Sequence, residues 1–348
     1  MVTDEFSKLY SFENLYKAHL KARRSKQYSK EVIDFESDLG PTLARLAESI
    51  KNGSYALQGY YFFEVFEPKK RLIHALHYQD RVVQHCLCDE IVGPSLESKL
   101  IFDNAACRIG KGSSFVYKRI TLFLSDYYKK HGCQGYFLRC DIRKFFDSID
   151  HQILKEKLSE VFHDVNTYQF LMDIIDSYEV TSGKGIPMGN QTSQWFAIYY
   201  LDELDRFIKE KLRIKYYVRY MDDMLIIAQD KNELKVILSL LRVYLRINLK
   251  LSFNDKTQIY PLRNGTDFLG FHFYLTETGK IVRKVMLKSK KNMRRAMKNF
   301  ATKYSQGLVD FETIRQSISS YCSHMRQGHT FFLRKKILNQ FPLRKSKC

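Results

Sequence analysis

An acidic pair, Asp222-Asp223, constrains the fold of this 348-residue chain more than any other feature. The pair stands between two apolar runs, Tyr216–Arg219 and Met224–Ile227, and each run has the composition of a short β-strand. A tight turn between two such strands would carry both carboxylates out of a sheet. Adjacent carboxylates repel each other, and a divalent cation beside them relieves that repulsion. The sequence therefore predicts a metal site at the tip of a hairpin.

The same pair has a simpler explanation when it is considered alone. Aspartate tolerates the backbone angles of tight turns, so an Asp-Asp pair often serves turn geometry only. Short motifs of this kind also occur by chance. The metal interpretation therefore depends on further segments that supply additional ligands and a substrate.

Positive charge is distributed unevenly along the chain. The formal net charge is +19, and +16 of it falls on Gly279–Cys348, where 18 Lys and Arg residues face only two acids, Asp310 and Glu312. Such a basic segment on a nearly balanced body is typical of contact with a phosphate backbone. No apolar run is long enough for a membrane span, and the N-terminus lacks a signal-peptide core. We expect a nucleic-acid partner and no membrane.

The seven cysteines are scattered, and none of them forms a CxxC pair. This usage favours reduced thiols and a cytoplasmic location. Apolar periodicity predicts a mixture of helices and strands in about two domains. Helical patterns cover 11–50, 80–92, 192–212 and 232–245, and the basic tail after Gly279 reads as helices at 289–303, at 313–326 and near 332–339. Strand patterns cover 60–66, 71–75, 136–142 and a strand-loop-strand ending at Phe273, and Asp150 is expected to cap a helix that begins near His151.

Asp141 supplies a third acid, directly after the strand-like run Tyr136–Cys140. A strand that ends in Asp, beside a hairpin tipped with Asp, can bring carboxylates from two segments to one metal. Oxygen ligands without a Cys/His cluster favour Mg²⁺ or Mn²⁺. Two such ions suit a reaction in which one activates a 3′-hydroxyl and the other stabilises pyrophosphate. Considered alone, Asp141 is explained as a turn or helix cap.

Six ordered segments resemble the motifs of bacterial reverse transcriptases of the group II intron-related kind. The resemblance covers roughly residues 60–273, and the order of six motifs is specific, whereas each motif alone is weak. The segments are Phe62–Arg81, Asp141–His151, Gly185–Gly189, Tyr220–Asp223, Lys256-Thr257 and Phe268–Phe271. The resemblance implies an α+β right-hand polymerase whose palm is an antiparallel sheet with helices. Its regions would be an N-terminal helical extension over 1–54, fingers over 55–135, a palm over 136–275 and a basic helical thumb over 276–348.

The resemblance also assigns chemical roles. Asp141, Asp222 and Asp223 would be catalytic and would bind two Mg²⁺ ions, for which Mn²⁺ could substitute. The backbone carbonyl of Ile142 would complete a metal shell. Lys256 would protonate pyrophosphate, or it is simply a surface lysine.

Nucleotide-binding roles fall on three of these segments. Lys69 and Arg71 would neutralise the incoming triphosphate. Phe146 stands where the family places its steric gate, so its ring would exclude a 2′-hydroxyl and select deoxyribose; alternatively, Phe146 is a core residue. Further nucleotide contacts are expected from Met188, Gly189 and Gln194. Contacts to the nucleic-acid backbone are expected from Arg283, Lys284, Lys288, Lys290, Lys291, Arg294, Arg295 and Lys298.

The segment Gly185–Gly189, which we call the glycine loop, departs from the usual family pattern together with the residues after it. Most reverse transcriptases have Gln before the loop glycine and Ser-Pro after it, whereas this chain has Met188 before it and Ser193-Gln194 after it. That combination resembles the enzymes of diversity-generating retroelements, which copy a template RNA with errors at adenines. Ser320–His329 also resembles a C-terminal element of that group. Antiphage-defence reverse transcriptases share parts of the pattern, so both biological roles stay open.

The expected activity is RNA-directed DNA synthesis on a structured noncoding template RNA. Its partners would be that RNA, an RNA–DNA duplex, dNTPs and a small accessory protein. No residues remain for an RNase H or endonuclease domain, so we expect other proteins to cut DNA or degrade RNA. The alternatives are a non-catalytic RNA-binding scaffold and an enzyme that synthesises RNA.

Overall fold

The computed structural model describes residues 5–66 and 71–343. The chain forms two compact units, and each unit is assembled from three separated stretches. The first unit comprises Met1–Ile109, Asp141–Lys215 and Ile237–Asn254, and the second comprises Gly110–Cys140, Tyr216–Val236 and Asp255–Cys348. The expected extension, fingers, palm and thumb are consecutive in sequence, and that division stays a prediction.

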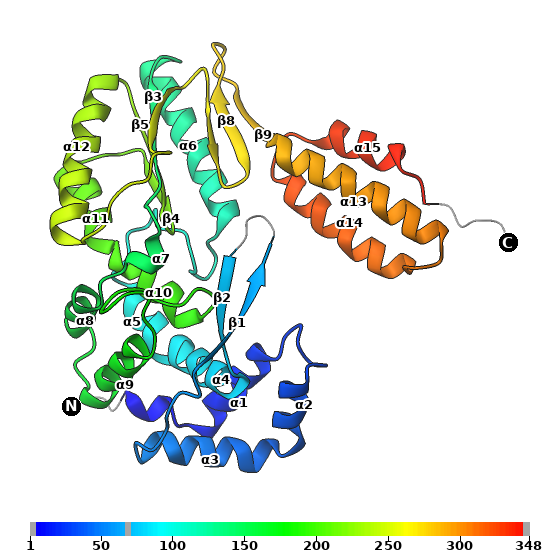
Figure 1. Cartoon of the computed structure of the whole chain (residues 1–348). Coiled ribbons are helices and arrows are strands. Elements are labelled where there is room, and N and C mark those ends of the chain that lie inside the picture. The colour runs from blue at the N-terminus through cyan, green and yellow to red at the C-terminus, as the bar shows by residue number, and fades with distance from the viewer. Residues whose placement is uncertain (1–4, 67–70, 344–348) are drawn as a thin grey trace. The chain divides into compact units, whose positions relative to one another are not determined.

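The first unit begins with the helices that the apolar periodicity predicts. After a short 3₁₀ turn, η1 (Phe6–Lys8), these are α1 (Phe12–Ala22), α2 (Lys30–Ser37) and α3 (Leu39–Lys51). Helices α1 and α2 pack with α4 (Tyr78–Leu87), which follows later in the chain, and α3 packs on α1 and α2 (Figure 1). The buried side chain of His19 ties three of the helices together, because its Nδ1 lies 2.9 Å from the Tyr78 hydroxyl and its Nε2 lies 3.2 Å from Glu36.

The expected hairpin lies between α3 and α4. Strands β1 (Tyr60–Val65) and β2 (Arg71–Leu76) pair antiparallel, with Tyr60 opposite Leu76. The predicted turn residues Glu67-Pro68-Lys69-Lys70 lie outside the described residues. After α4 the chain continues through a π-helical turn, η2 (Cys88–Val92), into α5 (Gly93–Glu97).

The remaining helices of the first unit follow Asp141. They are α7 (Phe145–Ser148), α8 (His151–Ser159), α9 (Val165–Asp176), α10 (Gln191–Tyr200), α11 (Asp202–Arg206), the π-helical turn η3 (Phe207–Lys211) and most of α12 (Lys231–Asn248). Asp150 caps α8 as predicted, because its carboxylate accepts from the Ile153 N–H at 3.2 Å. The prediction of one continuous helix over 192–212 is wrong: the helix breaks at Leu201, whose backbone angles (φ −96°, ψ 5°) leave the helical region.

The second unit contains an antiparallel sheet in the order β4-β5-β3-β6. Its strands are β3 (Tyr136–Cys140), β4 (Tyr217–Tyr220), β5 (Asp223–Ala228) and β6 (Gln258–Pro261). Apolar side chains such as Phe137, Val218 and Ile226 are fully buried. Helix α6 (Ser113–His131) packs against β4, and its Tyr127 contacts the ring of Tyr216 edge-on.

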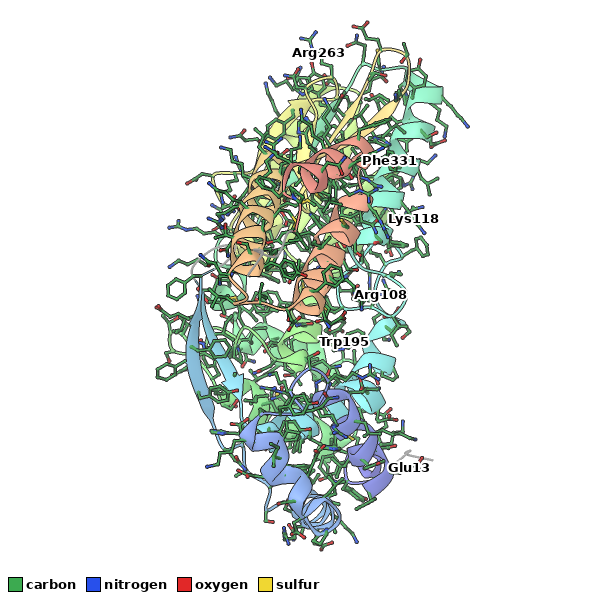
Figure 2. The ribbon with its side chains drawn as sticks, turned by 90° about the vertical axis from the view of Figure 1, so that its right-hand side faces the viewer. Glu13, Arg108, Lys118, Trp195, Arg263 and Phe331 are labelled. Carbon is green, nitrogen blue, oxygen red and sulfur yellow. The ribbon has the colours of Figure 1, made fainter. Side chains whose placement is uncertain are left out.

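A second sheet and three helices complete this unit. The sheet contains β7 (Thr266–Phe268), β8 (Phe271–Leu275) and β9 (Ile281–Val285). No strand was predicted in the tail after Gly279, where β9 pairs with β8 over five residues. The predicted helices after it are confirmed as α13 (Leu287–Ser305), α14 (Phe311–Arg326) and α15 (Phe331–Gln340), which pack on one another (Figures 1 and 2). Figure 2 labels Phe331, the first residue of α15.

The segment Ser320–His329 attaches these helices to the second sheet. The His329 N–H donates to the Arg283 carbonyl at 3.0 Å, and the Arg283 N–H points back to His329 Nδ1 at 3.3 Å. The ring of His324 lies 5.1 Å from that of Phe271. In the described part of the chain, no helix combines the length and apolar character that a membrane span requires.

Candidate active site

The acidic pair lies at the predicted strand-turn-strand. Tyr220 and Asp223 face each other at the ends of β4 and β5, so Met221 and Asp222 are the two residues of a tight turn. Met221 has a φ of +53°, in the left-handed region that non-glycine residues rarely adopt. Such a conformation costs about 1–3 kcal/mol and persists only where the surroundings enforce it. Both aspartates are half-buried.

A buried arginine supports this turn. Arg219 is 0% exposed, and its Nη1 donates to the Met221 carbonyl oxygen at 2.9 Å. A hydrogen bond from a charged donor in a buried setting is stronger than one between neutral groups. Sequence reasoning missed Arg219, although a single Arg inside an otherwise apolar strand was a signal that could have identified it.

The neighbouring strand β3 carries a second arginine to the acidic pair. The Arg139 guanidinium lies 3.4 Å from a carboxylate oxygen of Asp223. One residue further along β3, Cys140 is opposite Met224. The strand therefore ends at the same edge of the sheet as the acidic turn, and Asp141 is the next residue of the chain.

Asp141 opens the second stretch of the first unit. It is half-buried, and its carbonyl oxygen accepts from the Asn254 N–H at 2.9 Å. The next residue, Ile142, is buried and forms an isolated bridge with Phe253. These backbone bonds fix where the chain runs after it leaves β3.

The three acidic residues are the candidates for a metal site. Among the described residues, no three His, Cys, Asp or Glu side chains form a group able to hold a metal ion. Mg²⁺ at nucleotide-transferring sites usually takes one or two carboxylates and completes its shell with phosphate oxygens and water. The carboxylates of Asp222 and Asp223 fit that role in number and in oxygen chemistry. The two-ion site with Asp141 and Ile142 stays a prediction.

Phe146 and the glycine loop lie side by side in the first unit. The Ile186 N–H donates to the Phe146 carbonyl at 3.0 Å, and the Gly185 N–H donates to the Ile149 carbonyl at 2.8 Å. The imidazole Nε2 of buried His151 lies 2.7 Å from the Gly185 carbonyl oxygen. The half-buried Phe146 ring meets Phe145 edge-on at 5.7 Å. The structure thus brings two of the predicted nucleotide-binding segments together.

The glycine loop also approaches the β1–β2 hairpin. Gly189 has a φ of +119°, and a Cβ built there would lie 3.2 Å from Ile73 Cγ2 of β2. This position therefore favours glycine for both its backbone angle and its close packing. Arg71 is exposed on the same strand, Met188 is half-buried, and Lys69 lies outside the described residues.

Gln194 and Lys256, two further predicted residues, lie in different units. The side-chain oxygen of Gln194 is 3.1 Å from the Cys107 sulfur, within the first unit. Lys256 is exposed two residues before β6, in the second unit.

Most of the predicted backbone-binding residues lie on one exposed helix. Arg294, Arg295 and Lys298 are exposed on α13, and the last two line a groove of about 540 Å³ that Tyr321 of α14 also borders. Others in the predicted set, Lys284, Lys288, Lys290 and Lys291, are exposed or half-buried. Arg283 differs, because its guanidinium lies 5.1 Å from the centre of the Tyr117 ring and burial lowers its pKa.

Two solved structures share the arrangement of this chain. Telomerase from Candida albicans in complex with a TWJ fragment of telomeric RNA matches with a TM-score of 0.53 at 15% identity, over 86% of this chain and 58% of that chain. Apo telomerase from Candida tropicalis matches with a TM-score of 0.51 at 14% identity, over 80% and 59%. These similarities show the fold and confirm the predicted class, a right-hand polymerase of the α+β type.

Sequence comparison identifies the family. Residues 67–273, more than half of the chain, match the family model described as reverse transcriptase (RNA-dependent DNA polymerase). The chain is also 23% identical to the "Putative COX1/OXI3 intron 2 protein" of Saccharomyces cerevisiae, over 55% of this chain and 29% of that protein. It therefore spans less than a third of that relative and less than two thirds of either telomerase. The chain belongs to the reverse transcriptase family.

Proposed function

We propose that this protein is an RNA-directed DNA polymerase that extends a primer 3′-end along an RNA template with dNTPs. The observation that carries the proposal is the strained Met221-Asp222 turn, which buried Arg219 supports at the edge of the sheet where β3 ends before Asp141. Strain of this kind is typical of functional sites. Membership of the reverse transcriptase family supports the same conclusion.

The acidic residues would hold the metal. Asp141, Asp222 and Asp223, with the Ile142 carbonyl, would bind two Mg²⁺ ions, which Mn²⁺ could replace. When bound, such ions supply electrostatic stabilisation to a 3′-hydroxyl nucleophile and to the leaving pyrophosphate. Lys256 would supply a proton to that pyrophosphate.

The nucleotide would lie against the glycine loop and the β1–β2 hairpin. Lys69 and Arg71 would bind its triphosphate, and Phe146 would exclude a 2′-hydroxyl. The hydrogen bond between Ile186 and the Phe146 backbone supports this role, because it fixes the position from which the ring projects. Met188 would contact the new base pair, but it lacks the amide of the Gln that most reverse transcriptases have there. Discrimination between correct and incorrect base pairs would therefore rest on shape.

The test is incorporation of dNTPs on a primed RNA template. Asp222→Asn keeps the size of the side chain but removes its charge, so we expect extension to fall by about a thousandfold or more. RNA affinity, measured by filter binding, should stay within twofold. Asp34→Asn, at an exposed position of α2, is the matched control.

Extension by Asp222→Asn at the wild-type rate would contradict the site assignment. Absence of extension by the wild-type protein, with intact RNA binding, would instead favour a non-catalytic scaffold. Preference of the wild-type protein for rNTPs would favour RNA synthesis.

We infer further that the enzyme copies a noncoding RNA within a diversity-generating retroelement, with low fidelity. The support is Met188, the Ser193-Gln194 pair and the resemblance of Ser320–His329. A cytoplasmic location and a small accessory protein belong to this proposal. Antiphage defence with an associated noncoding RNA is the alternative role, which the shared motif pattern supports.

A further inference from the structure

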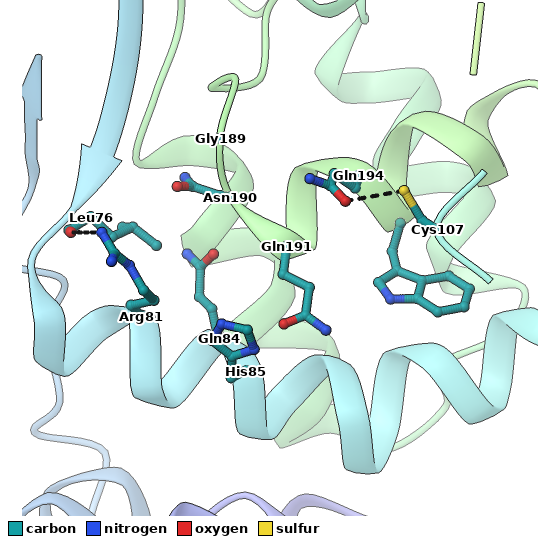
Figure 3. Close-up of a pocket in the computed structure, with 10 residues that line it drawn as sticks. Leu76, Arg81, Gln84, His85, Cys107, Gly189, Asn190, Gln191 and Gln194 are labelled. Carbon is teal, nitrogen blue, oxygen red and sulfur yellow. Dashed lines mark hydrogen bonds between the residues drawn. The ribbon is translucent and has the colours of Figure 1, made fainter. Parts of the chain in front are cut away.

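A cavity of about 330 Å³ lies in the first unit between α4 and the start of α10 (Figure 3). Its volume is within the range of small-molecule sites. Gln84 and His85 line it from α4, and Asn190, Gln191 and Trp195 line it from the other side. We call this site the amide pocket. It borders Gly189, so it lies next to the proposed nucleotide site.

Three amide atoms of the pocket residues are buried without a hydrogen-bond partner in the described structure. They are Gln84 Nε2, Asn190 Nδ2 and Gln191 Oε1. Gln84 is 2% exposed and Asn190 is 4% exposed. Buried polar groups are almost always paired, and leaving one unpaired is unfavourable. A polar ligand in this cavity would offer partners to these three atoms.

Hydrogen bonds to neighbouring groups determine which amide atom of each glutamine, the nitrogen or the oxygen, is left for a ligand. The Thr192 hydroxyl donates to Gln84 Oε1 at 2.7 Å, which leaves Nε2 as a donor. Gln191 Nε2 donates to the Asp89 carboxylate at 3.1 Å, which leaves Oε1 as an acceptor. With Asn190 Nδ2, the unpaired atoms are two donors and one acceptor.

The charges of the pocket favour a neutral ligand. Arg81 is the one permanently charged side chain among the lining residues, and its guanidinium donates to the Leu76 carbonyl at 3.3 Å. Burial lowers the pKa of His85, which favours its neutral form. A triphosphate would need several cationic partners, so the pocket suits a base better than a free nucleotide.

We propose that the amide pocket binds one unpaired pyrimidine base of the RNA template. The pairing edges of uracil and cytosine each present two acceptors and one donor, which complement two donors and one acceptor. The pairing edge of guanine presents two donors and one acceptor, and that of adenine presents one donor and one acceptor, so neither complements the pocket. The indole of Trp195 and the imidazole of His85 provide flat surfaces for such a ring. This inference rests on the proposed function, because it assumes an RNA template.

A base in this pocket would be held through neutral hydrogen bonds. Phosphate contacts weaken steeply with salt, because binding releases counterions. Hydrogen bonds between neutral groups do not release them. The pocket should therefore contribute a part of RNA affinity that persists at high salt and depends on base identity.

The experiment measures binding of fluorescent single-stranded RNA 12-mers, oligo(U), oligo(C) and oligo(A), by anisotropy at low and high salt. The wild-type protein should prefer oligo(U) and oligo(C). Gln191→Met and Asn190→Ser should each weaken that binding about tenfold, with oligo(A) unchanged. Serine still suits the position before α10, where Asn190 stands. Gln169→Met, at an exposed amide of α9, is the control.

Equal losses on all three oligomers, or no loss, would overturn the proposal. Unlabelled oligo(U) and millimolar UTP or dTTP are also tested as competitors of fluorescent oligo(U). If the free nucleotides compete as effectively as unlabelled oligo(U), the pocket is a free-nucleotide site and the proposal is overturned. Circular dichroism and thermal melting verify that each variant folds. The primed extension assay is run in parallel, so wild-type extension without a pyrimidine preference refutes this inference alone.

Discussion

A buried arginine supports the candidate catalytic turn. Arg219 bonds the carbonyl of Met221, the residue with the left-handed φ. Without that bond the carbonyl would lose a partner in a half-buried setting. The carboxylate of Asp222 is adjacent to the strained residue, so we expect its direction to depend on Arg219.

Arg219→Met tests this dependence. Methionine fills much of the same volume but cannot donate, and loss of a partner costs a buried carbonyl about 1–3 kcal/mol and this part-buried one less. We expect the extension rate at saturating dNTP to fall at least tenfold, because the carboxylate is misplaced, while RNA affinity changes little. Single-turnover primer extension measures the rate, and Arg246→Met, at an exposed position of α12, is the control.

An unchanged single-turnover rate in a folded Arg219→Met protein would contradict the positioning role. A loss of rate accompanied by a collapsed melting temperature would indicate a general folding defect. Arg219→Lys distinguishes these outcomes, since lysine retains a donor and should recover part of the rate.

At the residue scale, local signals were predictable and long-range partners were not. The Asp222-Asp223 turn and the Asp150 cap depend on residues within four positions of one another, so the sequence pattern contains them. The bond from His151 to Gly185 joins positions far apart in sequence. Nothing in the local pattern specifies such a partner.

Among the elements, α13 concentrates the positive charge that we expect to contact nucleic acid. Its exposed basic residues border the groove shared with Tyr321 of α14. An aromatic ring beside cations is suited to sugar or base contact next to phosphates. The groove therefore supports the predicted role of the basic tail.

Neutralising Arg294, Arg295 and Lys298 together as glutamines should weaken RNA–DNA duplex binding. The slope of log affinity against log salt is negative, and each lost phosphate contact should make it shallower by about 0.9. The slope is measured by anisotropy titrations at several salt concentrations. Changing Lys118, Lys129 and Lys130 on α6 to glutamine removes the same charge and is the control. An identical slope in both triple variants would mean that the α13 charges make no specific contact.

The element predictions were incomplete where tertiary contacts decide the structure. No strand was predicted at β9, which has only five residues and leads into a long basic helix. Its pairing with β8 is what selects the strand, and that is a tertiary effect. The break at Leu201 likewise lies inside a run whose apolar spacing is helical throughout.

For the whole molecule, the family and fold class followed from six motifs in order. Each motif is short, but their order and spacing restrict the chain to one polymerase architecture. The interleaving of the two units did not follow, because it depends on contacts between distant stretches. The biological role would depend on the nucleic acid that the proposed polymerase copies.

Sequencing of the RNA and cDNA that copurify with the full chain tests that role. Low-fidelity diversification predicts cDNA with substitutions concentrated opposite template adenines, because Met188 lacks the amide that would help to discriminate by hydrogen bonding. A short repetitive cDNA without that bias would support defence instead. Material from the Asp222→Asn protein is the control and should contain RNA but no cDNA.

The interleaved stretches have a consequence for how the protein is made. The first unit needs residues up to Asn254, so its N-terminal stretch leaves the ribosome long before its last partners exist. Contacts between distant stretches slow folding, and apolar surface stays exposed to aggregation in the meantime. Interrupted translation would leave both units unfinished, so the yield of active protein should depend on uninterrupted synthesis and on chaperones that shield the nascent chain.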